Sequence, residues 1–290
     1  MRVIYNPTAG RRRSILLWRV LDILAANGVK VDLTETVCAG HATNLARDAA
    51  SRGTRLVVAA GGDGTIAEVA NGLIGSSACL GVIPLGTANV LAHELALPFA
   101  PRSVAAALAF GRTRAIWPGI VRQEKASRLF VQMVGVGFDA HVVHTLSPSL
   151  KRMLGRGAYV IQTLTQLMKC DFDPISVRLD GIETQAASVI VSKGRLYGGQ
   201  YRLTADRDPG DEGFTVVLFD HGGPAMTLLY AAALPLNLLG RAPGVRHLRA
   251  RRVEFIGNRP APVQADGDKA GWLPLTISSA PGPIQVVVGS

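Results

Sequence analysis

An acid sits among glycines in the segment Gly61-Gly62-Asp63-Gly64-Thr65, which lies between an apolar run and a helix-like run. Glycines let a backbone approach a bulky anion closely, and the first N–H groups of the following helix point at that anion. A carboxylate repels a polyphosphate unless Mg²⁺ or a transferable proton lies between them. We therefore predict a phosphate-binding loop in which Asp63 is a catalytic and Mg²⁺-binding residue.

Thr65 and Glu68 also have a second interpretation. The pattern T-x-x-E is typical of a capping box, in which both side chains bind backbone N–H groups at the start of a helix and no ligand is needed. A capped turn does not account for three glycines around an acid. Both interpretations stay open for these two residues.

The pattern of apolar runs along the chain changes near its middle. Through about residue 115, strand-like runs alternate with helical patterns, which predicts a parallel sheet with crossover helices. Beyond Trp117-Pro118-Gly119, short β-branched runs are typical of antiparallel sheets. The predicted fold is an α/β domain with a doubly wound, mostly parallel sheet over 1–115, and an antiparallel β-sandwich domain over 116–290. A return of the last residues to the first domain is the alternative.

Individual elements can be placed from the same patterns. Helical spacing extends from Ser14 to Asn27, and one β-branched run of the second half covers Leu129 to Val134. Helical insertions are expected around Leu150 to Met168 and Pro224 to Leu239. The strands expected in the first half are Arg2 to Tyr5, Val29 to Leu33, Leu56 to Ala60 and Leu80 to Ile83.

Two further turns follow the first and the fourth of these strands, at Asn6 to Gly10 and at Pro84 to Asn89. In an open parallel sheet, ligands bind where the carboxyl ends of strands lead into turns. Thr36 and Gly40 would follow the second strand at the same edge. We therefore expect these segments to form one composite site with the Asp63 loop.

The composition limits the kinds of binding partner that we expect. Lysine and arginine number 31 against 21 acidic residues among 290, a net charge of +10, so the surface attracts anions. Only 6% of the residues are aromatic, and no zinc-finger or RNA-recognition signature occurs, so no nucleic-acid partner is predicted. Three widely spaced cysteines indicate a reducing cytoplasm rather than a disulfide framework.

An apolar stretch from Ala225 to Leu239 is shorter than the roughly 20 residues that span a bilayer. Five arginines follow it closely. An apolar helix beside arginines favours peripheral docking on an anionic membrane. These arginines are Arg241, Arg246, Arg249, Arg251 and Arg252.

Several motifs together resemble the diacylglycerol kinase catalytic-domain family, which includes sphingosine, ceramide and bacterial lipid kinases. Their order and spacing agree with that family. The motifs are Asn6-Pro7, Thr36 with Gly40-His41-Ala42, Gly61 to Leu73, and Pro84 to Asn89, followed more weakly by Tyr197-Gly198-Gly199, Asp211 to Phe214, and Asp266-Gly267-Asp268.

The resemblance implies an ATP-dependent, Mg²⁺-requiring kinase that transfers the γ-phosphoryl group to a lipid hydroxyl. Asp63 would organise Mg²⁺ or the attacking hydroxyl, and Asp268 would be the proton acceptor, where bacterial relatives usually carry glutamate. A homodimer is one option for the assembly. The implied nucleotide contacts are Asn6, Pro7, Thr36, Gly61, Gly62, Asp63, Gly64, Thr65, Glu68, Gly86, Thr87 and Asn89.

The second half of the chain contains further carboxylates that are candidates for catalysis or metal binding. Asp266 and Asp268 flank a glycine, so on an extended segment their side chains would point to one face; a solvated turn is the alternative. Relatives bind a structural metal at an Asp-Gly-Leu segment, which places a metal-ligand candidate at Glu212. Val90 follows Asn89 where many relatives carry an acid, so a weakened kinase is an open alternative.

Other functions compete with the lipid kinase. A nicotinamide-nucleotide kinase shares the glycine-Asp-glycine loop, and a non-catalytic nucleotide- or lipid-binding relative is the second alternative. A dinucleotide-binding oxidoreductase fits poorly, because no acid ends the next strand near Ile83. A P-loop ATPase is excluded by the absence of G-x-x-x-x-G-K-[ST].

Overall fold

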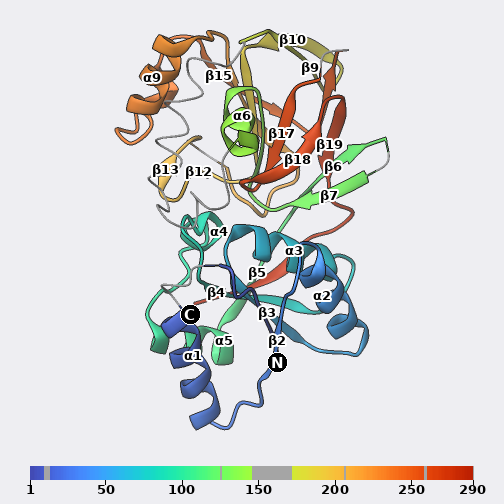
Figure 1. The fold of residues 1–290 in the computed structure, drawn as a ribbon, viewed down its shortest axis with the longest axis vertical. Coiled ribbons are helices and arrows are strands. Elements are labelled where there is room, and N and C mark those ends of the chain that lie inside the picture. Colours follow the sequence, from blue (N-terminus) through green and yellow to red (C-terminus); the bar gives the residue numbers. More distant parts are fainter. Residues whose placement is uncertain (10–13, 125, 146–171, 206, 258–259, 290) are drawn as a thin grey trace. The chain divides into compact units, whose positions relative to one another are not determined.

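The computed structural model describes residues 1–9, 14–124, 126–145, 172–205, 207–257 and 260–289. The chain divides into two compact units (Figure 1). The first unit joins Met1–Pro118 with Ala280–Ser290, and the second unit is Gly119–Ser279. The helix expected around Leu150 to Met168 lies outside the described residues.

The first unit is built on a six-stranded sheet in the order β2-β1-β3-β4-β20-β5. All neighbouring pairs are parallel except β20 with β5, so the predicted doubly wound, mostly parallel α/β fold is confirmed. The strands are β1 (Arg2–Tyr5), β2 (Asp32–Glu35), β3 (Leu56–Gly61), β4 (Cys79–Pro84), β5 (Arg112–Ile116) and β20 (Ile284–Val288).

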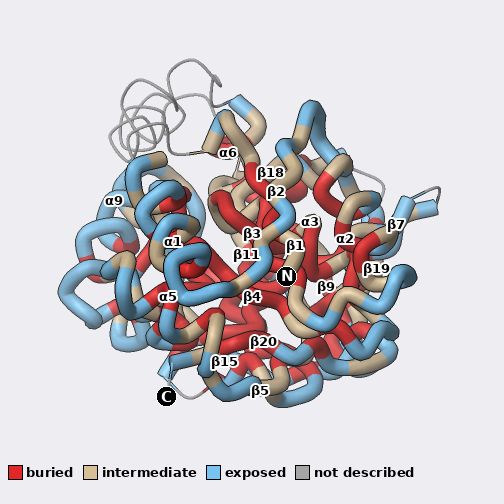
Figure 2. The backbone as a smooth tube through the Cα atoms, turned by 90° about the horizontal axis from the view of Figure 1, so that it is seen from below, coloured by how far each residue is buried: buried red, intermediate tan, exposed pale blue. Residues whose placement is uncertain are grey.

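Helices cover this sheet. Leu17 and Val20 from α1 and Val104 from α5 pack with Val58 and other strand residues in one buried cluster. The remaining longer helices pack on each other, with Gly72 of α3 against Ala46 of α2. Central strands are buried while the helices expose their outer sides (Figure 2). The helices are α1 (Ser14–Ala26), α2 (His41–Ser51), α3 (Asp63–Leu73), α4 (Val90–Glu94) and α5 (Pro101–Phe110).

The expected position of the second strand was wrong. The sequence predicted Val29 to Leu33, whereas β2 spans Asp32–Glu35. Gly28 adopts a left-handed φ of 76°, and the N–H of Val29 donates to Leu24 O at 3.0 Å. Val29 therefore closes the carboxyl end of α1, and the strand starts later.

The second unit is an antiparallel β-sandwich, as predicted. One sheet has the order β10-β9-β16-β19-β6-β7 and the other β15-β14-β11-β8-β17-β18. Their facing side chains form one core that includes Phe130, Val191, Phe214, Val253 and Ile277. The first sheet contains β6 (Gly119–Gln123), β7 (Ala126–Phe130), β9 (Ile175–Leu179), β10 (Ile182–Ala186), β16 (Arg252–Ile256) and β19 (Leu275–Ser279). The second contains β8 (Met133–Val136), β11 (Ser188–Ser192), β14 (Phe214–Phe219), β15 (Val245–Ala250), β17 (Pro262–Ala265) and β18 (Asp268–Trp272).

Smaller elements complete this unit. They are α6 (Phe138–Thr145), the hairpin of β12 (Leu196–Tyr197) and β13 (Tyr201–Arg202), α9 (Pro224–Ala233) and the 3₁₀ turn η2 (Leu239–Arg241). The helix predicted to reach Leu239 ends at Ala233, because Pro235 has no N–H to continue it and Asn237 has a left-handed φ of 58°. No helix in the described residues is long and apolar enough to cross a membrane.

Candidate active site

The carboxyl ends of β1, β2, β3 and β4 lie side by side because these strands are parallel neighbours. Backbone hydrogen bonds tie the loops that leave them. The N–H of Asn6 donates to Ala60 O at 3.0 Å, and that of Thr36 donates to Tyr5 O at 2.8 Å. The first unit therefore brings the loops after β1, β2, β3 and β4 to one edge, as the sequence predicted.

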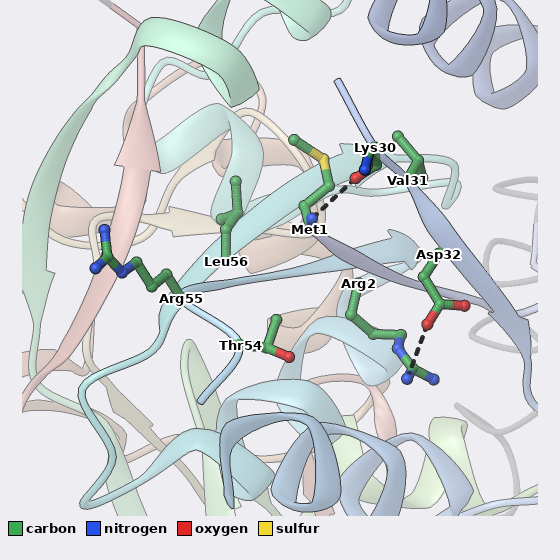
Figure 3. Close-up of a pocket in the computed structure, with 8 residues that line it drawn as sticks. All are labelled: Met1, Arg2, Lys30, Val31, Asp32, Thr54, Arg55 and Leu56. Carbon is green, nitrogen blue, oxygen red and sulfur yellow. Dashed lines mark hydrogen bonds and ion pairs between the residues drawn. The ribbon is translucent and has the colours of Figure 1, made fainter. Parts of the chain in front are cut away.

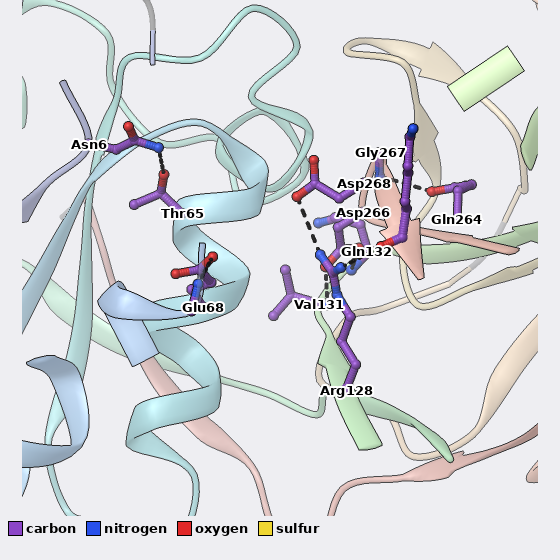
Figure 4. A network of polar contacts seen from close by, with 12 residues as sticks. Asn6, Thr65, Glu68, Arg128, Val131, Gln132, Gln264, Asp266, Gly267 and Asp268 are labelled. Carbon is purple, nitrogen blue, oxygen red and sulfur yellow. Dashed lines mark hydrogen bonds and ion pairs between the residues drawn. The ribbon is translucent and has the colours of Figure 1, made fainter. Parts of the chain in front are cut away.

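Asn6 organises two of these loops. Its Nδ2 donates to Thr65 Oγ1 at 3.1 Å, which joins the β1 loop to α3 (Figure 4). Its Oδ1 accepts from the N–H of Thr8 at 3.0 Å and from the Thr8 hydroxyl at 2.8 Å. Pro7 lies within this turn and is half-buried.

Close packing requires several of the loop glycines. A Cβ on Gly61 would lie 2.4 Å from Thr65 Oγ1, and one on Gly86 would lie 2.5 Å from the Cα of Gly62. Gly61 O accepts from the N–H groups of Leu85 at 2.9 Å and Gly86 at 3.2 Å. The loops after β3 and β4 therefore pack directly against each other. This contact requires glycine independently of whether an anion binds.

The capping-box interpretation of Thr65 and Glu68 was wrong. Helix α3 starts at Asp63, with Gly62 as its N-cap and no side-chain cap, so Thr65 lies inside the first turn. Glu68 instead caps α2: its carboxylate accepts from the N–H groups of Gly40 at 2.8 Å and Ala42 at 3.1 Å. Glu68 thus holds the loop after β2 against α3 and needs no ligand to do so.

Asp63 lies where two helices begin. It is the first residue of α3, and its Oδ1 accepts from the N–H of Leu91 in α4 at 3.3 Å. Burial raises the pKa of this carboxyl, and the backbone N–H groups of Leu91 and Val90 oppose that shift. The side chain keeps partial solvent exposure. It is therefore fixed by backbone groups and still accessible to a ligand.

Asn89 has an unusual environment. Its φ of 48° is left-handed, its side chain is 1% exposed, and Nδ2 donates to Gly86 O at 2.9 Å. Within the described residues, its buried Oδ1 has no hydrogen-bond partner. Thr87, two residues earlier, is exposed. The loop after β4 therefore presents one hydroxyl to solvent and holds one buried amide.

In the second unit, the structure shows the turn that the sequence left open as the alternative to an extended segment, although Asp266 is buried rather than solvated. Asp266 and Gly267 form the two-residue turn between β17 and β18, with φ values of 50° and 81°. Asp-Gly is a favoured pair for such turns because both positions need φ above zero. The two carboxylates consequently have different environments.

Asp266 has a structural role. Its carboxylate accepts from the N–H groups of Val131 at 2.7 Å, Gln132 at 2.8 Å and Met133 at 2.9 Å (Figure 4). Burial raises its pKa to about 6, and these amide hydrogen bonds oppose the shift. The same contacts explain why the predicted single strand from Leu129 to Val134 is split into β7 and β8.

Asp268, the candidate proton acceptor, begins β18. Its Oδ2 lies 3.3 Å from Nη2 of Arg128, and the side chains of the two residues are 44% and 34% exposed. Asp268 is therefore more exposed than Asp266, which is 8% exposed. Sequence reasoning did not identify Arg128, because the pair is separated by 140 residues.

Sequence reasoning also missed a buried polar network beside this turn. Asp139 of α6 accepts from the Tyr197 hydroxyl and, at 2.7 Å, from Nε2 of Gln264. Oε1 of Gln264 accepts from the N–H of Gly267 at 2.9 Å. Burial raises the pKa of Asp139, opposed by its two side-chain donors. The network links the Tyr197-Gly198-Gly199 segment to the hairpin that carries Asp268.

Glu212, the second metal-ligand candidate, is exposed on the loop before β14. In the parts of the chain that the structure describes, no group of three histidine, cysteine or acidic residues could hold a metal ion. The backbone carbonyls of Asp211 and Glu212 accept hydrogen bonds from Lys193 and Arg207.

A surface hollow of the first unit lies at the other edge of its sheet. It is lined by residues at the starts of β1, β2 and β3, including an Arg2–Asp32 ion pair of 2.9 Å (Figure 3). The amino group of Met1 donates to Lys30 O at 3.0 Å there. None of the candidate site residues belongs to this hollow.

Two protein families match the chain. The diacylglycerol kinase catalytic domain covers residues 1–120, and the YegS C-terminal NAD kinase beta sandwich-like domain covers residues 132–288. A diacylglycerol kinase of Bacillus subtilis (strain 168) is 31% identical over 282 residues, which are 94% of this chain and 91% of that protein. A diacylglycerol kinase of Staphylococcus carnosus (strain TM300) is 27% identical over 98% of this chain and 94% of its own length.

Solved structures show the same fold. A crystal structure of a diacylglycerol kinase from Bacillus anthracis str. Sterne superposes with a TM-score of 0.74 at 20% identity, covering 99% of this chain and 96% of that one. The sequence matches extend through both units. The chain therefore belongs to the diacylglycerol kinase and YegS-like family of lipid kinases.

Proposed function

We propose that this protein is an ATP-dependent kinase that phosphorylates a hydroxyl of a diacylglycerol-like lipid. Family membership supports kinase chemistry on a lipid. The observation that carries the proposal is Asp63, fixed by a backbone N–H of α4 at the start of α3 while remaining accessible. Helix N-termini attract phosphate, and a carboxylate placed there can hold the Mg²⁺ that accompanies ATP.

The loops at this edge have separate tasks in the proposal. Backbone N–H groups from Gly61 to Thr65 bind phosphate oxygens, and the Thr87 hydroxyl is exposed for a further contact. Asn6, Pro7 and Thr36 contact the nucleotide, and the buried Gly86 and Asn89 shape the loop after β4. Glu68 acts indirectly, by holding the loop after β2. Mg²⁺ would neutralise phosphate charge when held at Asp63.

The transfer step assigns the proton to Asp268. The lipid hydroxyl oxygen attacks the γ-phosphorus, the bond from that phosphorus to the β–γ bridging oxygen breaks, and ADP leaves. The Asp268 carboxylate accepts the hydroxyl proton as the new bond forms. The Arg128 guanidinium holds one carboxylate oxygen of Asp268 and thereby orients the other oxygen toward the lipid hydroxyl.

A transfer assay tests this proposal. Purified protein is incubated with γ-labelled ATP and a panel of acceptors: diacylglycerol, a sphingoid base, phosphatidylglycerol and NAD. We expect label in a lipid, and its loss in Asp63→Asn and Asp268→Asn. Asp48→Asn is the matched control, because the Asp48 carboxylate is 45% exposed and forms an ion pair with Arg52 at the end of α2. Transfer to NAD alone would establish the nicotinamide-nucleotide kinase instead, and ATP binding without transfer would establish a non-catalytic relative.

We also propose that α9 and the residues after it dock on an anionic membrane. Leu228, Leu229, Leu236 and Leu238 are 47%, 43%, 67% and 43% exposed. No acidic residue occurs from 221 to 253. Arg246 and Arg252 pair with acids, whereas Arg241, Arg249 and Arg251 are exposed. In this proposal the protein works in the cytoplasm, at the membrane surface.

Vesicle sedimentation tests the docking surface. We expect binding to vesicles that contain phosphatidylglycerol and much weaker binding to phosphatidylcholine alone. Leu236→Ser should weaken binding, while Ile182→Ser, a change at another exposed aliphatic residue of the same unit, should not. Equal binding by the two variants would remove this surface from the proposal.

A further inference from the structure

Lys193, directly after β11, is 0% exposed, although a lysine is rarely buried completely. Its ammonium group donates to Asp211 O at 2.6 Å and to Gly213 O at 2.9 Å. The same nitrogen lies 5.3 Å from the centre of the Phe214 ring. Burial and the neighbouring Arg207 lower the pKa of this ammonium group to about 7, and backbone carbonyls and an aromatic face hold its charged form.

A second cation converges on the same carbonyls. Arg207 is 6% exposed, and its Nη2 donates to Asp211 O at 3.1 Å, to Glu212 O and to Gly213 O. Three consecutive carbonyl oxygens are therefore bound by two positive side chains. The side chains of Asp211 and Glu212 themselves are exposed.

The backbone is shaped to make this cluster. Gly213 has a left-handed φ of 77°, and a Cβ there would lie 2.9 Å from Ala250 O. Its N–H donates to Ser279 Oγ at 3.0 Å. At the start of the loop, the N–H of Gly210 donates to Asp208 Oδ1 at 2.8 Å. The loop from Arg207 to Gly213 is pinned at both ends while its carbonyls turn toward the two cations.

Backbone carbonyls that converge in this way are also ligands for hard divalent cations. Burying a positive charge is costly, so two of them need strong compensation. A divalent ion would have to enter beside both, against Coulomb repulsion in a poorly solvated site. The cluster and a metal ion are therefore alternatives at this position.

We propose that Lys193 and Arg207 form a built-in cation site that replaces a divalent metal ion in the loop from Arg207 to Gly213. The second unit accordingly folds without a metal bound near Glu212. This inference is independent of whether the protein is a kinase, because it concerns the stability of a loop in the sandwich.

Metal binding to the intact protein tests the inference without any variant. Equilibrium dialysis with Mn²⁺ or Ca²⁺, in the absence of nucleotide, should detect no ion that depends on Glu212. The melting temperature should stay within about 1 °C on addition of EDTA, Mg²⁺ or Ca²⁺. One ion per chain that disappears in Glu212→Gln would overturn the proposal. An ion that is lost only in Asp63→Asn belongs to the predicted nucleotide site and does not contradict the proposal.

Substitution of the cation supplies the second test. Lys193→Met keeps a long apolar stem and removes the charge and its donors, so it should lower the melting temperature by about 5 to 10 °C. Lys269→Met is the matched control, because Lys269 is an exposed lysine of the same unit, and it should melt like the wild type. If Lys193→Met also melts like the wild type, the cation has no such role. If it fails to fold, the dialysis result on the intact protein decides.

Discussion

Gly62 and Gly86 meet backbone to backbone: a Cβ built on Gly86 would lie 2.5 Å from the Cα of Gly62 and 2.8 Å from Asn89 Oδ1. The two loops at the carboxyl edge of the first sheet therefore have no room for a methyl group between them. This contact fixes the loop that carries Asp63 against the loop that leads into α4.

We predict that Gly86→Ala destabilises the protein by about 1 to 3 kcal/mol, because the added methyl group must push the two loops apart. Urea unfolding measures this change. Gly282→Ala is the matched control, since nothing lies within 4 Å of a Cβ there, and it should change stability by less than about 0.5 kcal/mol. Equal stability of the two variants would show that the loops separate easily.

Glu68→Ala should cost about 0.5 to 2 kcal/mol, since it leaves the N–H groups of Gly40 and Ala42 without their cap. In the transfer assay, KM for ATP should change little if Glu68 only supports the β2 loop. A large rise in KM with unchanged stability would instead make Glu68 a direct nucleotide contact.

The pKa of Asp266, about 6 in the folded protein against 3.8 for an ordinary aspartate, gives a pH dependence. Between those values the folded state holds a proton that the unfolded state has released. Stability from this group therefore falls as pH rises from about 4 to 6, by up to about 3 kcal/mol in total. Urea unfolding at several pH values should show this slope in the wild type and not in Asp266→Asn. Parallel curves for the two proteins would contradict the assignment.

Gln264→Leu removes both the donor to Asp139 and the acceptor for Gly267. If Asp268 is the proton acceptor, the turn that immediately precedes it loses its support, and kcat should fall by up to about 100-fold with a smaller change in KM. Gln185→Leu, at an exposed glutamine of β10, is the control and should retain activity. A loss of stability without a preferential loss of kcat would make the network purely structural.

The alternation of apolar runs and helical spacing was sufficient to predict the parallel sheet, because those patterns depend on local burial. It also placed Asn6, Thr36, Asp63 and Thr87 at one edge. The start of β2 was missed because the cap of α1 extends to Val29. The turn at Asp266 was one of the two alternatives that the sequence left open, and the Asp-Gly pair, a known hairpin signal, favours it.

Other features depend on contacts between distant residues. The amides of Val131 and Gln132 bind Asp266 more than 130 positions away, so nothing local marks the break between β7 and β8. The same holds for the link from Gln264 to Asp139. Lys193 resembles any surface lysine in the sequence, and only the fold encloses it with carbonyl groups.

Strand β20 has a consequence for biosynthesis. It lies between β4 and β5 in the first sheet, with Val286 beside Leu80. During translation, β20 leaves the ribosome only after the entire sandwich has been made, so β4 and β5 at first lack the strand that lies between them. Until then the edge of β4 is open to pairing with another nascent chain.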